Sequence, residues 1–168
     1  MENDAGSSGR MQAIAVGGLA AAVLDALDAL VAYRLAFGMS PLAIYQFVAS
    51  GLLGQEAYAG GVPAALLGLL VHFLVAFTAA AVFVLASERL PRIRREAVRW
   101  GLGYGVLVFV VMGFGVIPLS RIPPSTPTVP LLLNGVISHA VLVGLPIALA
   151  ARRYLGRPPS PVLSAATA

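Results

Sequence analysis

The chain contains no cysteine, which excludes disulfide bonds, thiolate metal sites and cysteine nucleophiles. It also contains no lysine, so arginine supplies all 11 of its basic residues. Charged residues make up only 11% of the 168 residues, against about 25% in soluble domains. No Gly-x-Ser-x-Gly, His-Glu-x-x-His or phosphate-loop motif occurs. These absences argue against a soluble globular domain and favour a protein that is not an enzyme.

Long apolar runs dominate what is present, since 59% of the residues are hydrophobic. Four runs reach the roughly 20 residues that a helix needs to cross a bilayer. Backbone hydrogen bonds must be closed internally in lipid, so each run is predicted to be a helix. The expected spans are residues 11–37, 63–86, 97–119 and 129–151. They predict an all-α membrane protein with one four-helix domain over 11–154, a disordered tail over 1–10 and a flexible tail over 155–168.

The arginines gather between the second and third spans and after the fourth. They are Arg89, Arg92, Arg94, Arg95, Arg99, Arg152 and Arg153. Residues 38–62 contain no arginine, and residues 120–128 contain only Arg121. Arginine and lysine are retained on the cytoplasmic side during insertion, which predicts that both termini are cytoplasmic. The cluster is expected to contact lipid headgroups. It has no interleaved aromatic residues, so the bilayer, and not nucleic acid, is the expected partner.

The first outer loop contains a helix signal of its own. Ser40 precedes Pro41, which is typical of an N-cap followed by proline at the first helical position. Apolar residues then recur on one face over three turns. We therefore expect a short interfacial or re-entrant helix in this loop, ending near Gly51 or Gly54.

Four ionisable residues lie deep inside the spans. Asp25 and Asp28 are three residues apart, and so lie on one face of the first span. His72 and His139 each end the pattern Pro-x4-Gly-x3-His in the second and fourth spans. At about 1.5 Å per residue, all four reach a similar level, about 13–18 Å below the outer surface. They form the candidate site.

Asn134 and Arg34 are the supporting polar residues expected near this site. An aspartate at such a depth costs about 2.5–3.5 kcal/mol, so we expect it to bind a proton or to pair with a histidine. The first interpretation is a proton- or ion-responsive protein with a role in transport or acid stress. Because four spans leave little room for a substrate cavity, transport would call for a homo-oligomer.

Other interpretations stay open. The Asp/His pairs could join helices in a structural or partner-binding membrane subunit, since polar pairs between helices are common. Two histidines at one depth could also be the axial ligands of a b-type haem. Two aspartates and two histidines could hold Zn²⁺ or another divalent metal.

Residues 72–154 also resemble the YagU-like family of bacterial inner-membrane proteins. The shared features are a histidine early in the second span, the Glu88-Arg-Leu-Pro91-Arg-Ile93 turn and a glycine-rich third span ending at Pro118. Glycine and histidine in the fourth span, followed by Arg152 and Arg153, complete them. The resemblance implies a bacterial inner membrane and tolerance of acid. It also implies an acidic residue one turn before the last histidine, where this chain has Gly135.

Overall fold

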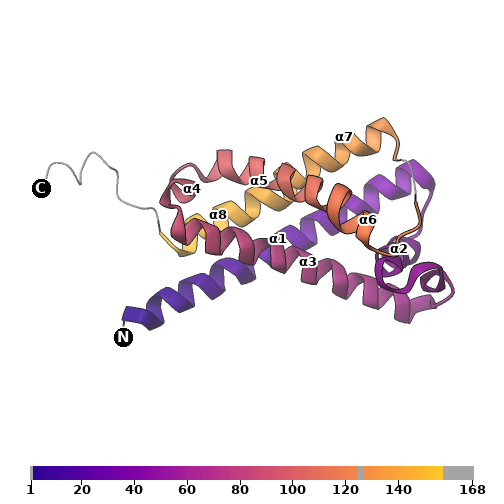
Figure 1. The fold of residues 1–168 in the computed structure, drawn as a ribbon, viewed down its shortest axis with the longest axis horizontal. Helices are drawn as coiled ribbons and strands as arrows, with labels where there is room; N and C mark the ends of the chain where they lie inside the picture. The colour runs from indigo at the N-terminus through magenta and orange to yellow at the C-terminus, as the bar shows by residue number, and fades with distance from the viewer. Residues whose placement is uncertain (1, 125–126, 157–168) are drawn as a thin grey trace, which may run out of the picture.

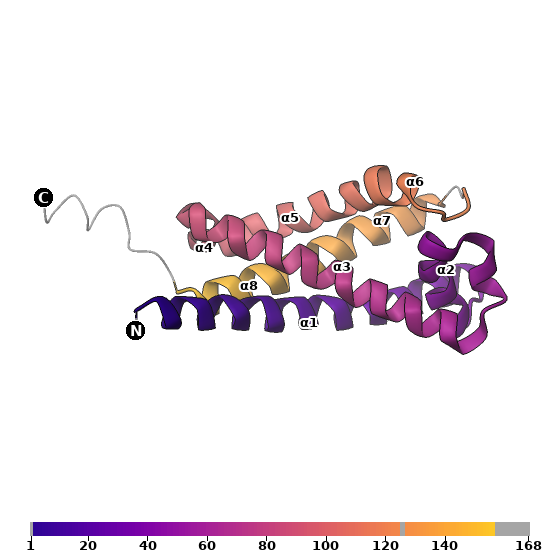
Figure 2. The ribbon, with the colours of Figure 1, turned by 60° about the horizontal axis from the view of Figure 1, so that its bottom comes forward.

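The computed structural model describes residues 2–124 and 127–156, which form helices and turns with no strand. In chain order the elements are α1 (Glu2–Phe37), α2 (Pro41–Leu53), the 3₁₀ helix η1 (Gly54–Tyr58), α3 (Gly61–Arg89), α4 (Pro91–Arg95), α5 (Ala97–Val111), the π-helix η2 (Met112–Val116), α6 (Ile117–Leu119), α7 (Val129–Ser138), the π-helix η3 (His139–Gly144) and α8 (Leu145–Tyr154). Four candidate membrane spans confirm the predicted all-α membrane fold: Ser7–Phe37, Gly61–Arg89, Ala97–Leu119 and Val129–Tyr154. Figures 1 and 2 show them extending along the long axis of the molecule.

The start of α1 differs from the sequence prediction. The helix begins at Glu2, so residues 2–10 are helical where a disordered tail was expected. Arg10 Nε lies 2.9 Å from Glu88 Oε1 near the end of α3, which ties the first turns to the bundle. A Cβ atom on Gly9 would lie 2.7 Å from the carbonyl oxygen of Tyr154, so the backbones pack closely here. The predicted flexible C-terminal tail falls, from residue 157 onward, outside the described residues.

Alanines make up much of the core, and many of the large apolar side chains point outward. Ala13, Ala21 and Ala80 are fully buried, as are Ala148 and Ala151. On α3, by contrast, side chains such as those of Leu66, Leu70 and Leu74 are more than 60% exposed. Small residues let helices approach closely when the surrounding lipid is as apolar as leucine. This arrangement is typical of helices packed within a bilayer.

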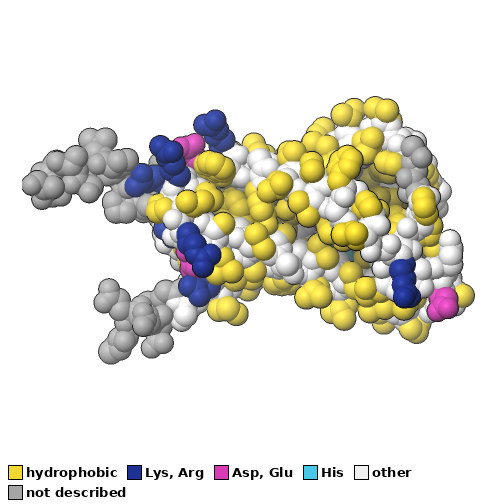
Figure 3. All heavy atoms as spheres, viewed as in Figure 1, with side chains coloured by type: hydrophobic (Ala, Val, Ile, Leu, Met, Phe, Trp, Pro, Cys, Tyr) yellow, Lys and Arg dark blue, Asp and Glu magenta, His cyan; other side chains and the backbone are white. Residues whose placement is uncertain are grey.

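The arginine cluster lies at one end of the molecule, which we call the arginine end. It is built from the last turn of α3, from α4, from the first turn of α5 and from the last turn of α8. Figure 3 shows the basic side chains gathered there, whereas apolar side chains cover the helices between the two ends. The opposite end, which we call the loop end, carries α2 and residues 120–124.

The predicted helix in the first outer loop is confirmed as α2. Ser40 Oγ accepts a hydrogen bond from the Ala43 amide at 3.2 Å, and Gly54 ends the helix with a φ of 62°. A Cβ atom on Gly68 would overlap the carbonyl oxygen of Tyr45, so α2 lies directly on the backbone of α3. Gly68 is about 10 Å along α3 from its start. The short helix therefore lies against the side of α3, near the loop end of the bundle.

Two spans contain π-helical turns that the pattern of apolar residues does not predict. The π-helix η2 ends two residues before Pro118, and η3 ends two residues before Pro146. A proline inside a helix lacks an N–H donor and clashes with the carbonyl four residues earlier. A π-turn just before the proline relieves this conflict, and such turns are frequent at functional sites. His139 is the first residue of η3.

Glycines bring α5 against η3. A Cβ atom on Gly105 would overlap the carbonyl oxygen of His139, and one on Gly144 would overlap that of Gly101. The two backbones are therefore in contact beside the histidine. Tyr104 extends this packing to α3, because its hydroxyl donates to the Ala79 carbonyl at 2.7 Å.

A pair of glycine substitutions tests this contact. We expect Gly105→Ala to destabilise the protein by about 1–3 kcal/mol, because the new methyl group overpacks the interface. Gly103→Ala is the matched control on the same helix, since nothing lies within 4 Å of its added Cβ atom. That change is expected to stabilise by about 0.5–1 kcal/mol, through the helix preference of alanine. Unfolding by detergent titration measures both, and equal effects would contradict the packing.

Candidate functional site

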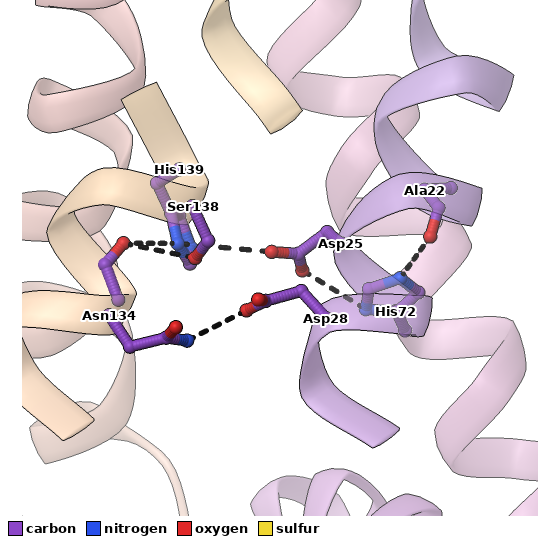
Figure 4. Close-up of polar contacts among 8 residues, drawn as sticks. Ala22, Asp25, Asp28, His72, Asn134, Ser138 and His139 are labelled. Carbon is purple, nitrogen blue, oxygen red and sulfur yellow. Dashed lines mark hydrogen bonds and ion pairs between the residues drawn. The ribbon is translucent and has the colours of Figure 1, made fainter. Parts of the chain in front are cut away.

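Three helices place their polar side chains around Asp25 of α1. His72 of α3 approaches on one side, with its Nδ1 atom 3.9 Å from Asp25 Oδ2. His139, at the junction of α7 and η3, approaches on the other, with Nδ1 3.8 Å from Asp25 Oδ1. Figure 4 shows the carboxylate between the two imidazole rings. The structure thus brings together three of the four residues that the sequence placed at one depth.

The hydrogen bond of His72 to α1 fixes which of its nitrogens carries the proton. His72 Nε2 lies 2.9 Å from the carbonyl oxygen of Ala22. A carbonyl oxygen can only accept, so Nε2 must donate. In the neutral ring Nδ1 is then an unprotonated acceptor. That acceptor faces the Asp25 carboxylate, which is also an acceptor.

His139 has the opposite tautomer. Its Nδ1 atom lies 2.9 Å from the Gly135 carbonyl, one turn earlier in α7, and therefore donates to it. The Nδ1 proton is directed at Gly135, so it does not form a short bond to Asp25. The second nitrogen, Nε2, is the acceptor of the neutral ring. The ring packs edge-on against Phe109 of α5, with centroids 5.5 Å apart.

The cluster around Asp25 therefore lacks a donor. Within residues 2–124 and 127–156, no group donates a hydrogen bond to the Asp25 carboxylate, whose side chain is only 21% exposed. A partly buried carboxylate without a donor is costly, as is an acceptor nitrogen facing it at 3.9 Å. One proton on either group removes both costs once His72 Nδ1 and Asp25 close from 3.9 Å to hydrogen-bond distance. The geometry therefore fits a site that holds a shared proton.

Asp28 forms a separate contact with α7. Its Oδ2 atom accepts a hydrogen bond from the amide nitrogen of Asn134 at 2.9 Å. The Asn134 side chain, which the sequence analysis named as a supporting residue, thus joins α1 to α7 one turn from Asp25. Arg34, the other one, lies apart at the loop end, where Nη1 donates to the Gly38 carbonyl.

Two phenols that the sequence analysis did not assign to the site also lie near Asp25. Tyr33 and Tyr45 are both close enough to experience the charge of its carboxylate. Burial and, second, the charge of Asp25 raise the pKa of Tyr45, which therefore stays protonated at physiological pH. The Tyr45 ring also packs edge-on against His72. The placement of α2 beside α3 creates this contact, and nothing in the local sequence signals it.

A cavity of about 220 Å³ opens beside the cluster. Asp25, His72 and His139 are among its lining residues, and most of the others are apolar. It extends between α3 and α5 to the loop end, where α2 and residues 120–122 border it. There the Arg121 amide donates to the Gly51 carbonyl at 3.0 Å, joining the two bordering segments.

A haem does not fit between the histidines, because the Asp25 carboxylate lies within 3.9 Å of both imidazoles. It occupies the space that a porphyrin would need. Within the described residues, no group of three or more His, Cys, Asp and Glu side chains is arranged to hold a metal ion. His72 Nε2 and His139 Nδ1 also donate their hydrogens to carbonyl oxygens, so these two nitrogens have no lone pair with which to ligate a metal.

Comparison of the chain with models of protein families, with curated proteins and with solved structures found no match. The resemblance to the YagU-like family therefore stays a prediction from its motifs.

The two tautomers can be observed directly. We expect ¹⁵N spectra of histidine-labelled protein at neutral pH to show an N–H at Nε2 of His72 and at Nδ1 of His139, because each nitrogen faces a carbonyl oxygen. The chain has only 2 histidines, so His72→Gln and His139→Gln assign each signal by elimination. Two rings with the same protonated nitrogen would contradict this arrangement.

Proposed function

We propose that this chain is a proton-responsive membrane protein that senses acid through Asp25, His72 and His139. The observation that carries the proposal is the Asp25 carboxylate, which lies 3.9 Å and 3.8 Å from two imidazoles and receives no hydrogen bond from the described residues. Asp25 and His72 together hold one proton. This proton holds α1 against α3.

Acid changes the charges within this cluster. A second proton taken up by the cluster of Asp25, His72 and His139 in acid would give the cluster a net positive charge. In a medium of low dielectric constant a net charge is costly unless water reaches it, which favours an opening of the helices around the cluster. Asp28 stays held by the uncharged Asn134 amide. We therefore expect acid to move α3 away from α7 at the level of the histidines.

The cavity supports a supply of protons from the loop end. It connects the cluster to the loop end, at Ser120 and Gly51. Toward the arginine end the bundle is closed by buried Ala80 and Val84, and by the packing of Phe83 on Tyr104 with centroids 5.0 Å apart. A cavity that joins the site to the loop end suits a sensor of acid on that side.

The resemblance to the YagU-like family, which is associated with tolerance of acid, agrees with this proposal. That pattern has an acidic residue one turn before the last histidine, where this chain has Gly135. Here the Gly135 carbonyl accepts from His139, and the nearby carboxylate comes from Asp25 on α1. Asp25 of α1 would thus take the place beside the His139 ring that an acidic residue of the fourth span has in the family pattern.

A distance measurement tests the response to acid. Leu70→Cys on α3 and Ile137→Cys on α7 would carry spin labels, since both side chains are more than 60% exposed and the chain has no other cysteine. We expect pulsed electron paramagnetic resonance in lipid vesicles to show a separation about 1–2 Å larger at acidic than at neutral pH. His72→Gln and His139→Gln, which keep an N–H donor, should abolish this increase. Asp28→Asn is the matched control and should retain it.

The contacts between helices also support a second function, that of a structural or partner-binding subunit. His72 bonded to Ala22, and Asn134 bonded to Asp28, would then serve only to join helices. This alternative predicts that His72→Ala lowers the unfolding temperature whereas the label distance stays the same at every pH. A constant distance in the unsubstituted protein would therefore reject acid sensing and favour the structural function.

We further propose that the arginine end faces the cytoplasm of a bacterial cell, with the protein in the inner membrane. Lysine and arginine accumulate on the cytoplasmic side during insertion, where the arginines would contact anionic headgroups. Gln55→Cys at the loop end should react with an impermeant maleimide in intact cells. Leu90→Cys at the arginine end should react only after permeabilisation. The reverse pattern would overturn this orientation, and the cysteine-free parent measures background labelling.

A further inference from the structure

The polar end of the cavity presents acceptors to its interior. The Asp25 carboxylate and the Nδ1 atom of neutral His72 lie 3.9 Å apart and both require a hydrogen. His139 directs its Nδ1 proton to Gly135, away from this gap. A ligand that matches this end must bring N–H or O–H donors, and a cation matches the carboxylate best.

The rest of the cavity is apolar and of limited size. Val71, Val75 and Val108 are among the side chains that line it between α3 and α5. Its volume of about 220 Å³ exceeds that of the engineered cavity of about 150 Å³ that is known to bind benzene in another protein. The space therefore admits one ring or a short branched chain together with a small polar head.

We propose that this cavity binds small lipophilic amines in their ammonium form, with N–H groups donating to Asp25 and to Nδ1 of His72. The inference rests on the proposed function, because the ammonium group takes the place of the shared proton. The charges balance, since one ammonium ion enters and one proton leaves, and no covalent bond is made. The other titratable groups that face Asp25 are His139 and the phenols of Tyr33 and Tyr45.

Calorimetric titration of the purified protein in detergent micelles, with benzylammonium as the probe, tests this inference. We expect saturable binding that releases about one proton per ligand, detected by repeating the titration in buffers of different ionisation heat. Benzyltrimethylammonium has the same ring and charge but no N–H group, and benzyl alcohol has the ring without the charge. Both should bind at least about tenfold more weakly.

Two substitutions separate the polar end from the apolar space. Asp25→Asn should weaken benzylammonium binding by about tenfold or more, whereas the matched control Asp28→Asn should leave it unchanged. Val75→Phe should fill the cavity and block binding while the label distance still responds to acid. The unfolding temperature of each variant shows that it has folded.

The outcomes distinguish the two proposals. Equal binding of the three probes would mean an apolar cavity without amine recognition, and would overturn the inference. An acid-dependent label distance without benzylammonium binding would overturn it as well, but would leave the proposed function standing. Loss of both would overturn both. Binding of benzylammonium that is unaffected by Asp25→Asn would place the amine elsewhere.

Discussion

The hydrogen bond from His72 Nε2 to the Ala22 carbonyl is the contact on which the rest of the site depends. It joins α1 to α3 and commits one imidazole nitrogen to donating. The other nitrogen is left as an acceptor against Asp25, and a shared proton is then the simplest way to satisfy both groups. Without this bond the ring could turn its N–H toward the carboxylate, and the cluster would be an ordinary neutral pair.

The surrounding fold makes such a cluster possible. Alanine and glycine at the helix contacts bring the backbones close together, whereas many of the large apolar side chains face outward. Close packing at Gly105 and the π-turn at His139 set the position of the second imidazole. The cavity lies where α3 and α5 separate, above the contact that Tyr104 makes with Ala79. The cluster thus borders an apolar cavity toward the loop end and closely packed helices toward the arginine end.

The same donor deficit underlies both proposals. One proton would satisfy Asp25 and His72, and a second proton on the cluster would change the forces between the helices. An ammonium group offers the same hydrogens on a larger, apolar body. The two ligands would compete, because each needs the one position between the carboxylate and the ring.

The four spans, the short helix after Pro41 and the gathering of arginines at one end could be predicted from the sequence, since hydropathy, capping and charge are local signals. The sequence also placed Asp25, His72 and His139 at one depth, because helical rise converts residue counts into distances. It did not anticipate that α1 starts at Glu2, because the contacts that order its first turns come from α3 and α8.

The contacts between these residues could not be predicted from the sequence. The rotation of each helix separated Asp28, bonded to Asn134, from the histidines, and left Arg34 outside the cluster. The carbonyl oxygens of Ala22 and Gly135 set the tautomers of His72 and His139. Every residue has a backbone carbonyl, so the pattern of residue types does not indicate which carbonyl a histidine will meet. The cavity likewise arises from how α2, α3 and α5 pack. The depth of a residue in the membrane follows from counting residues along one helix, whereas its contacts depend on how several helices pack.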